Sequence, residues 1–261
     1  MSLTQWAYIG AVFLGLCWWW PICVTAQGNF EIQVYGSETV APGQTMFELH
    51  SNTAIKGTTE KEEGVFPTQH AWHETIEITH GFTPWFETGF YIFTSVQPDA
   101  GWKWVGDHIR PRLRVPESWH LPVGLSLSTE IGYQQRTFST DTWTLEIRPI
   151  IDKQWGPWYV SFNPVFEHSL KGEGTKRGFE FSPNAKASYA VTPKISAGLE
   201  YYGALGPVTA FDPLRKQQHL LFPVLDVDLG PRWECNVGVG IGLTAATDRL
   251  LVKLILGYRF D

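Results

Sequence analysis

The sequence has few cysteines, few charged residues and almost no long apolar runs. It contains 3 cysteines in 261 residues, and charged residues make up 18% of the chain. One stretch is long enough to cross a bilayer as a helix, and it lies at the extreme N-terminus, from Trp6 to about Val24. The rest of the sequence offers no candidate membrane helix. The net charge of −6 argues against binding of nucleic acid, which requires clustered Lys and Arg.

Residues 1–26 are expected to be a signal peptide for export. The apolar core ends in Val24-Thr25-Ala26, whose small residues suit a cleavage site. No Lys or Arg precedes the core, and the core is long, so an uncleaved membrane anchor is the alternative. Cleavage would leave Cys235 as the one remaining cysteine, which can form neither an intrachain disulfide nor a metal cluster.

Aromatic residues, in contrast, are abundant at 15% of the chain, and the sequence after the signal alternates apolar and polar residues. In 123–134, Val, Leu, Leu, Thr, Ile and Tyr alternate with Gly, Ser, Ser, Glu, Gly and Gln. A period of two residues places the two sets on opposite sides of a β-sheet. The same pattern predicts twelve strands, near 44–52, 69–80, 84–95, 103–115, 122–136, 141–153, 156–169, 176–190, 193–204, 217–229, 231–245 and 248–260.

The connections favour a membrane barrel over a soluble sandwich. Tight turns such as Gly81-Phe82-Thr83 and Thr192-Pro193 alternate with generally longer polar loops such as 53–69. Bacterial barrels show short periplasmic turns, longer outer loops and aromatic bands at both membrane boundaries. We therefore expect an all-β fold, a transmembrane antiparallel up-and-down β-barrel of about 12 strands over residues 44–261. Five prolines fall inside the expected strands, where they cannot donate to the ladder: Pro111, Pro149, Pro164, Pro183 and Pro223.

Residues 27–43 are expected to form an N-terminal periplasmic segment. Glu31–Tyr35 also alternates, so an inward plug or part of another hairpin are alternatives to a periplasmic tail. A further hairpin would give 14 strands instead of 12.

The expected inner face is rich in charge. Its densest signal is 108–114, where one His and three Arg follow one another with period two. Neighbouring strands place carboxylates on the same face, and Arg pairs bidentately with carboxylates. The candidate lumen-lining and selectivity residues are His108, Arg110, Arg112, Arg114, Arg148, Glu77, Glu87, Glu130 and Glu146.

These charges have two interpretations. They could line an aqueous path and select solutes, as charged rings do in pores. They could instead join the walls of a small barrel by ion pairs, since large side chains can fill the lumen of about twelve strands. The second interpretation is favoured for most of them.

A membrane-embedded hydrolase is a further alternative, but the sequence supports it poorly. No Gly-x-Ser-x-Gly occurs, and Ser161 and Ser182 have no evident histidine partner. His70 and His73 project to opposite faces of a strand, which is poor geometry for a metal. We predict no catalytic residue, no metal site and no cofactor.

Two stretches carry a resemblance to a known family. His73–Gly81, with Trp85–Gly89, resembles the outer-membrane barrels grouped with the porins of phenol (aromatic-compound) degradation operons, and Glu200–Gly203 and Leu256–Phe260 fit the same picture. The resemblance implies a bacterial outer-membrane location, contact with lipid, and passage of small molecules. Tyr258 and Phe260 also resemble the terminal signal that the barrel-insertion machinery recognises, although Asp261 adds one residue after the aromatic.

The function that follows is an outer-membrane, porin-like channel for small solutes with a charged lumen. Its main rival is a structural or partner-binding barrel with a plugged lumen.

Overall fold

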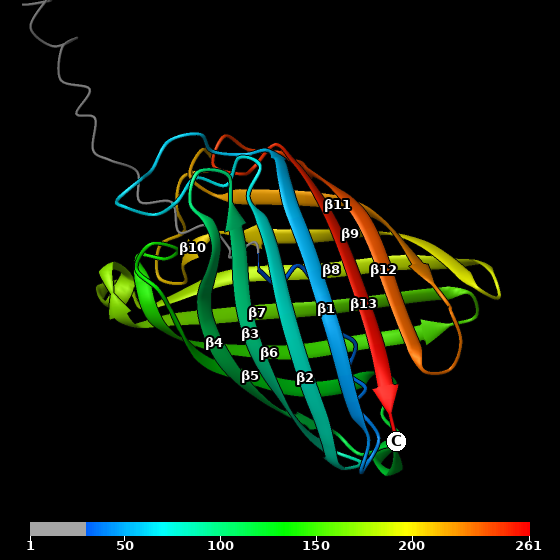
Figure 1. The fold of residues 1–261 in the computed structure, drawn as a ribbon. Helices are drawn as coiled ribbons and strands as arrows, with labels where there is room; N and C mark the ends of the chain where they lie inside the picture. The colour runs from blue at the N-terminus through cyan, green and yellow to red at the C-terminus, as the bar shows by residue number, and fades with distance from the viewer. Residues whose placement is uncertain (1–29) are drawn as a thin grey trace, which may run out of the picture.

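The computed structural model describes residues 30–261, which form one closed β-barrel (Figure 1). The strands are β1 (Thr45–Lys56), β2 (Trp72–Thr83), β3 (Phe86–Gln97), β4 (Gly101–Arg114), β5 (Gly124–Gln134), β6 (Asp141–Trp155), β7 (Trp158–Gly172), β8 (Phe179–Thr192), β9 (Ile195–Ala204), β10 (Gly206–Pro207), β11 (Gln218–Val227), β12 (Trp233–Gly242) and β13 (Leu250–Phe260). Two short 3-10 helices, Glu117–Trp119 and Glu173–Lys176, lie in connections.

Each long strand pairs antiparallel with its neighbours in sequence, and β1 pairs with β13 to close the ring. The two-residue β10 pairs with β8 beyond the end of β9, so we do not count it among the strands of the barrel wall. The wall therefore has the twelve strands predicted from the alternation, within a few residues at each end. The alternative of fourteen strands is wrong, because 31–35 forms no strand.

The two ends of the barrel differ in their connections. At the end that holds the C-terminus, three of the connections are tight turns, such as that between β2 and β3. We call this the short-turn end, and the opposite end the long-loop end. Loop length sorts less strictly than expected: β3 and β4 are joined by only Pro98–Ala100 at the long-loop end, whereas 115–123 at the short-turn end contains a 3-10 helix.

The wall is apolar outside and polar inside, the reverse of a soluble protein. On β5, Leu127 is 42% exposed on the outer face while the adjacent Ser128 is buried. Val237 and Leu254 likewise point outward. Exposed tryptophans lie at strand ends, such as Trp155 and Trp158 beside one tight turn. Such a pattern matches a lipid-facing band bounded by aromatic residues. Among residues 30–261, no helix has the length and hydropathy needed to span a membrane.

The five strand prolines occupy interruptions in the ladders. Pro149 and Pro164 both lie in a gap of the β6–β7 pairing, between Ile147↔Phe166 and Ile151↔Phe162. The other three lie in comparable gaps: Pro111 between β4 and β5, Pro223 between β11 and β12, and Pro183 between the ends of the β8–β9 and β8–β10 pairings. Each proline thus keeps pairing on one side and lacks it on the other, where its missing N–H costs little.

Residues 30–40, which we call the lumen segment, run through the interior of the barrel. Phe30, Ile32, Val34 and Tyr35 are buried there without strand pairing. This placement differs from the periplasmic segment expected over 27–43 and corresponds to the inward alternative. The segment lies inside the barrel because its apolar side chains pack against lumen-facing aromatic residues such as Phe222 and are removed from water. The expected signal peptide lies outside the described residues.

Candidate solute pathway in the barrel lumen

The arginines of β4 form the centre of the charged lumen. Arg110 donates to Glu77 of β2 and lies 3.4 Å from a carboxylate oxygen of Glu87 on β3. Arg112 Nε lies 2.8 Å from that same oxygen. All four side chains are at most 6% exposed, so each buried charge has an opposite charge beside it, as the cost of burial requires.

Arg110 reaches Glu77 by crossing the strand between them. Gly89 of β3 stands opposite Arg110 on one side and opposite Thr79 on the other. A Cβ added at Gly89 would lie 3.1 Å from Arg110 Nη2 and 2.9 Å from Thr79 Oγ1. The missing side chain therefore leaves the channel through which the guanidinium passes.

The remaining predicted residues also face the interior, but they do not form one ladder. His108 pairs with Glu130 across β4 and β5. Arg148 binds Glu146 of its own strand, with Nε 2.7 Å from Oε1. Arg114 lies at the short-turn end and pairs with the exposed Glu117 at 2.8 Å. The structure therefore brings together Arg110, Arg112, Glu77 and Glu87, and places the other five in separate pairs around them.

A second ionic cluster lies on the opposite wall. Lys253 of β13 donates to Glu200 of β9, whose other oxygen is 3.1 Å from Lys186. Lys186 also contacts Asp226 at 2.7 Å, and the Tyr202 hydroxyl donates to Glu200. Sequence alternation puts all five on the inner face, but only the barrel's closure shows that they meet.

Barrel side chains hold the main chain of the lumen segment. Asn163 accepts from the Tyr35 N–H at 2.8 Å and donates to its carbonyl at 3.0 Å, and the Ser161 hydroxyl donates to the same carbonyl. Lys253 donates to the carbonyl of Ile32, and Arg112 donates to that of Gly36. The segment pairs with no strand, and these hydrogen bonds satisfy the main-chain groups named above.

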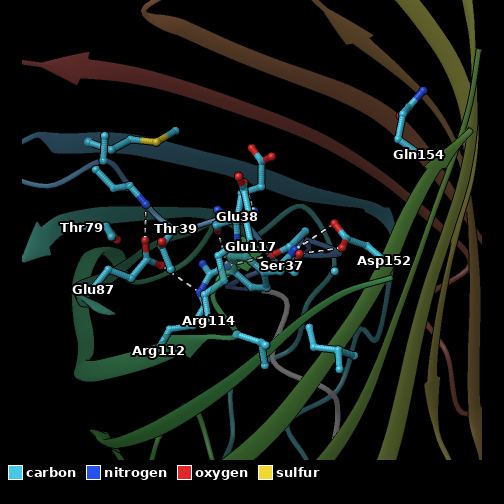
Figure 2. A pocket seen from close by; sticks show the side chains of 18 of the residues that line it. Ser37, Glu38, Thr39, Thr79, Glu87, Arg112, Arg114, Glu117, Asp152 and Gln154 are labelled. Atoms are coloured by element: carbon cyan, nitrogen blue, oxygen red, sulfur yellow. Dashed lines mark hydrogen bonds and ion pairs between the residues drawn. The ribbon is translucent and has the colours of Figure 1, made fainter. Parts of the chain in front are cut away.

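Side-chain contacts complete the attachment. The Ser37 hydroxyl and N–H both bind Asp152, at 2.6 and 3.0 Å, as the dashed lines in Figure 2 show. The N–H of Val40 donates to Glu87 at 2.6 Å. The segment is thus bound to β3 and β6 near the short-turn end.

Tyr35 has a special position within the segment. Its ring centroid lies 4.8, 4.9 and 4.8 Å from the guanidinium carbons of Arg110, Arg112 and Arg148. We call these three residues the arginine cage. The phenolic hydroxyl lies 3.0 Å from that of Tyr91 and donates to Glu31.

The lumen is hollow toward the short-turn end and packed toward the long-loop end. Two cavities of about 1100 and 610 Å³ open beside the lumen segment, and Tyr35 lines both. Figure 2 shows Arg112, Arg114 and Glu87 in the larger one. A third space of only about 130 Å³ lies near Phe30 and Phe138 toward the other end. Among residues 30–261, the segment and its aromatic contacts occupy the interior beside these spaces.

Glu48, His50 and Glu77 place potential metal-ligand atoms within 4.8 Å of one another, a group that sequence analysis did not propose. All three are buried, and the two glutamates stand directly opposite each other on β1 and β2. Arg110 donates to Glu77, however, so a fixed positive charge adjoins the group and opposes a cation. His50 lies 3.4 Å from Glu77 and supplies a second partner for that carboxylate.

A closed antiparallel barrel with an apolar outside and a charged inside defines the class of outer-membrane β-barrel proteins. Solved structures share its architecture. An outer membrane channel from Pseudomonas putida F1 superposes with a TM-score of 0.59 at 12% identity, covering 88% of this chain and 100% of that one. The KdgM porin in complex with disordered oligogalacturonate gives a TM-score of 0.51 at 11% identity, covering 83% and 99%. The NanC porin gives 0.51 at 7% identity, covering 82% and 99%.

A comparison of the sequence with models of protein families assigns the chain to a family. The model of the family described as "Putative MetA-pathway of phenol degradation" matches residues 109–260, which is more than half of the chain. The chain belongs to this family, which confirms the resemblance seen in the sequence. Among curated proteins, none matches the chain. The structural neighbours named above are porins and channels rather than enzymes.

Proposed function

We propose that this protein is a porin-like channel of a bacterial outer membrane and that the lumen segment controls the flux of small polar solutes through it. One observation carries the proposal. The wall encloses a lumen lined by charged side chains, and a chain segment outside the wall's hydrogen-bonded ladders fills its middle. Such a segment can move without opening the barrel.

The lumen-lining residues predicted from the sequence act as selectivity residues in this proposal. Arg110, Arg112 and Arg114 already line the larger cavity, and Arg148 would face a solute once the segment moves. Rings of Arg favour anionic solutes, while the glutamates beside them limit that preference. Export by the N-terminal signal, contact with outer-membrane lipid, and insertion through the C-terminal strand belong to the same proposal.

The conductance of single channels in planar lipid bilayers tests the proposal. Ser37→Ala combined with Val40→Pro removes the segment's hydroxyl bond to Asp152 and its N–H bond to Glu87. Because the wall is untouched, we expect a folded barrel with larger and more frequent open steps than wild type. Thr39→Ala is the matched control, since its hydroxyl makes only a long exposed bond to the Pro84 carbonyl at 3.4 Å.

A reversible lock provides the converse test. In a Cys235→Ser background, Ser37→Cys with Asp152→Cys places two thiols where the native oxygens lie 2.6 Å apart. Oxidation should suppress the open steps, and a reductant should restore them. Equal conductance in the loosened, locked and wild-type proteins would reject control by the segment.

The plugged lumen favours one other function, that of a structural barrel that displays its long loops to a partner. If neither wild type nor the loosened variant shows open steps, this alternative replaces the channel.

A further inference from the structure

The contacts of Tyr35 go beyond what is needed to hold a plug. Three guanidinium groups face one aromatic ring within 4.9 Å, and the ring's hydroxyl donates to Glu31. Glu31 in turn lies 3.6 Å from Arg148 Nη1. The lumen segment thus presents a ring and a carboxylate side by side to the arginine cage.

These two groups match the chemistry of the cage. Guanidinium planes stack on aromatic faces and also pair with carboxylates through a fork of donors. Among the described residues, Arg110 Nε of the cage has no hydrogen-bond partner, and Arg148 Nη1 makes no hydrogen bond, although it lies 3.6 Å from an oxygen of Glu31. Both side chains are at least nine-tenths buried, so an acceptor from a ligand would satisfy donors that the protein leaves unpaired.

We propose that the arginine cage binds single-ring aromatic carboxylates, which displace Tyr35 and Glu31 from it. The inference rests on the proposed channel, because it names the solute class of the same lumen. Like Tyr35, the solute's ring lies against the guanidinium groups, and its carboxylate takes the place of Glu31 beside Arg148.

The charge balance of the site supports one negative charge on the solute. Glu77, Glu87 and Glu146 already pair with the three arginines and stay in the wall. Only Glu31 leaves with the segment, so a monocarboxylate restores the original balance. A neutral ring would leave Arg148 with one carboxylate fewer, and a dicarboxylate would add a charge without a partner.

The cavities give a solute access to the cage. Arg110 and Arg112 line the space of about 1100 Å³, and Tyr35 lines both this space and the one of about 610 Å³. Both are much larger than a single ring. A solute in either space therefore reaches Tyr35 without any change in the wall.

Tyr35 competes with the solute because it is attached to the same chain. A tethered group acts at an effective concentration of about millimolar. Removing the ring should strengthen solute binding about tenfold or more, since three cation–π contacts of the competitor are lost.

Isothermal titration of the purified, detergent-folded protein with benzoate tests the proposal, with cyclohexanecarboxylate and benzyl alcohol as probes that lack the π face or the charge. We expect benzoate to bind wild type weakly and Tyr35→Leu about tenfold more tightly. Tyr35→Phe is the matched control, because it keeps the ring and should remain within about threefold of wild type. Since position 35 lies outside the wall, heat-modifiable migration in gels should show all three proteins folded.

Several results would overturn the inference. They are equal binding of benzoate and cyclohexanecarboxylate, no saturable benzoate binding to a folded Tyr35→Leu variant, or the same affinity in Tyr35→Leu and Tyr35→Phe. The result of the benzoate-binding test can be told apart from the result of the conductance test of the channel. Benzoate binding without open steps would retain the site and reject the channel, whereas open steps in the loosened variant without benzoate binding would reject the site alone.

Discussion

The lumen keeps its charged residues in small neutral groups. Arg110 pairs with Glu77 and shares Glu87 with Arg112, and Lys253 shares Glu200 with Lys186. In a site with little water, removing one member of such a group leaves its partner without a counter-charge, which costs more than losing an exposed pair. The stability of the barrel should therefore depend strongly on which ion pair is broken.

Arg110→Met should lower the free energy of unfolding by about 3–5 kcal/mol, because Glu77 loses its guanidinium while staying buried. Arg232→Met is the control. Its partner Asp261 is 67% exposed, so the loss of this pair should change stability far less than the loss of Arg110. Denaturant titration of the detergent-folded proteins measures both values. Similar losses in the two variants would show that burial does not set the strength of these pairs.

At the scale of single residues, the sequence predicted which side chains face inward, but it did not predict which of them pair with one another. Alternation alone placed Arg110, Glu77 and Glu87 on the inner face. That Arg110 reaches β2 depends on Gly89, which has no side chain at the crossing point. Lys186 and Glu200 stand opposite each other in the β8–β9 hairpin. Lys253 joins them from β13, 53 positions after Glu200, and no local pattern encodes that contact.

Among the elements, the strands were the most predictable because period-two alternation is a local signal. The β12 alternation in 231–245 gave the strand that the structure has at Trp233–Gly242. The strand prolines were the apparent contradiction. The structure resolves it through interrupted ladders, such as the shared gap beside Pro149 and Pro164, whose position follows from pairing and not from sequence.

The depth of an outward residue should set the cost of charging it. Val237 lies near the middle of β12 and faces outward, so Val237→Arg should cost about 2–4 kcal/mol in lipid vesicles. Trp233 shares its face at the strand end, and Trp233→Arg should cost about 0–1 kcal/mol. Unfolding titrations in vesicles compare them. An equal cost at the two depths would remove the case for a lipid-facing wall.

For the whole molecule, closure depends on the last strand. β13 pairs with β1 over the full length of both, from Thr45↔Phe260 to Lys56↔Leu250. The Phe260 ring packs against Phe47 of β1, with centroids 5.3 Å apart. The residues proposed for recognition by the insertion machinery therefore also seal the barrel.

Phe260→Ala should reduce the amount of folded protein in outer-membrane fractions several-fold, because both the insertion signal and the β1–β13 contact are weakened. Phe162→Ala is the matched control, since Phe162 is similarly exposed on the outer face of β7 and removes a comparable apolar area. Quantification of the heat-modifiable band compares the two. If both variants accumulate equally, the terminal aromatic has no special role in assembly.

The path of the lumen segment could not be predicted at any scale. Its contacts are long-range, as Tyr35 binds Asn163, which lies 128 positions further along the chain. Burial inside a barrel also requires that barrel to exist first. The short alternation of Glu31–Tyr35 was consistent with a tail, a hairpin or an inward segment, and the sequence could not choose among them.

The barrel holds the lumen segment mainly through hydrogen bonds to its main chain, and this has a consequence for engineering. Asn163, Ser161 and Lys253 bind carbonyl or N–H groups of the lumen segment and not its side chains. Gln33, whose side chain makes a long bond of 3.5 Å to Glu48, can therefore be exchanged while the anchoring bonds remain. Substitutions at this position would then change the free width of the lumen while the main chain of the segment stays bound to the wall.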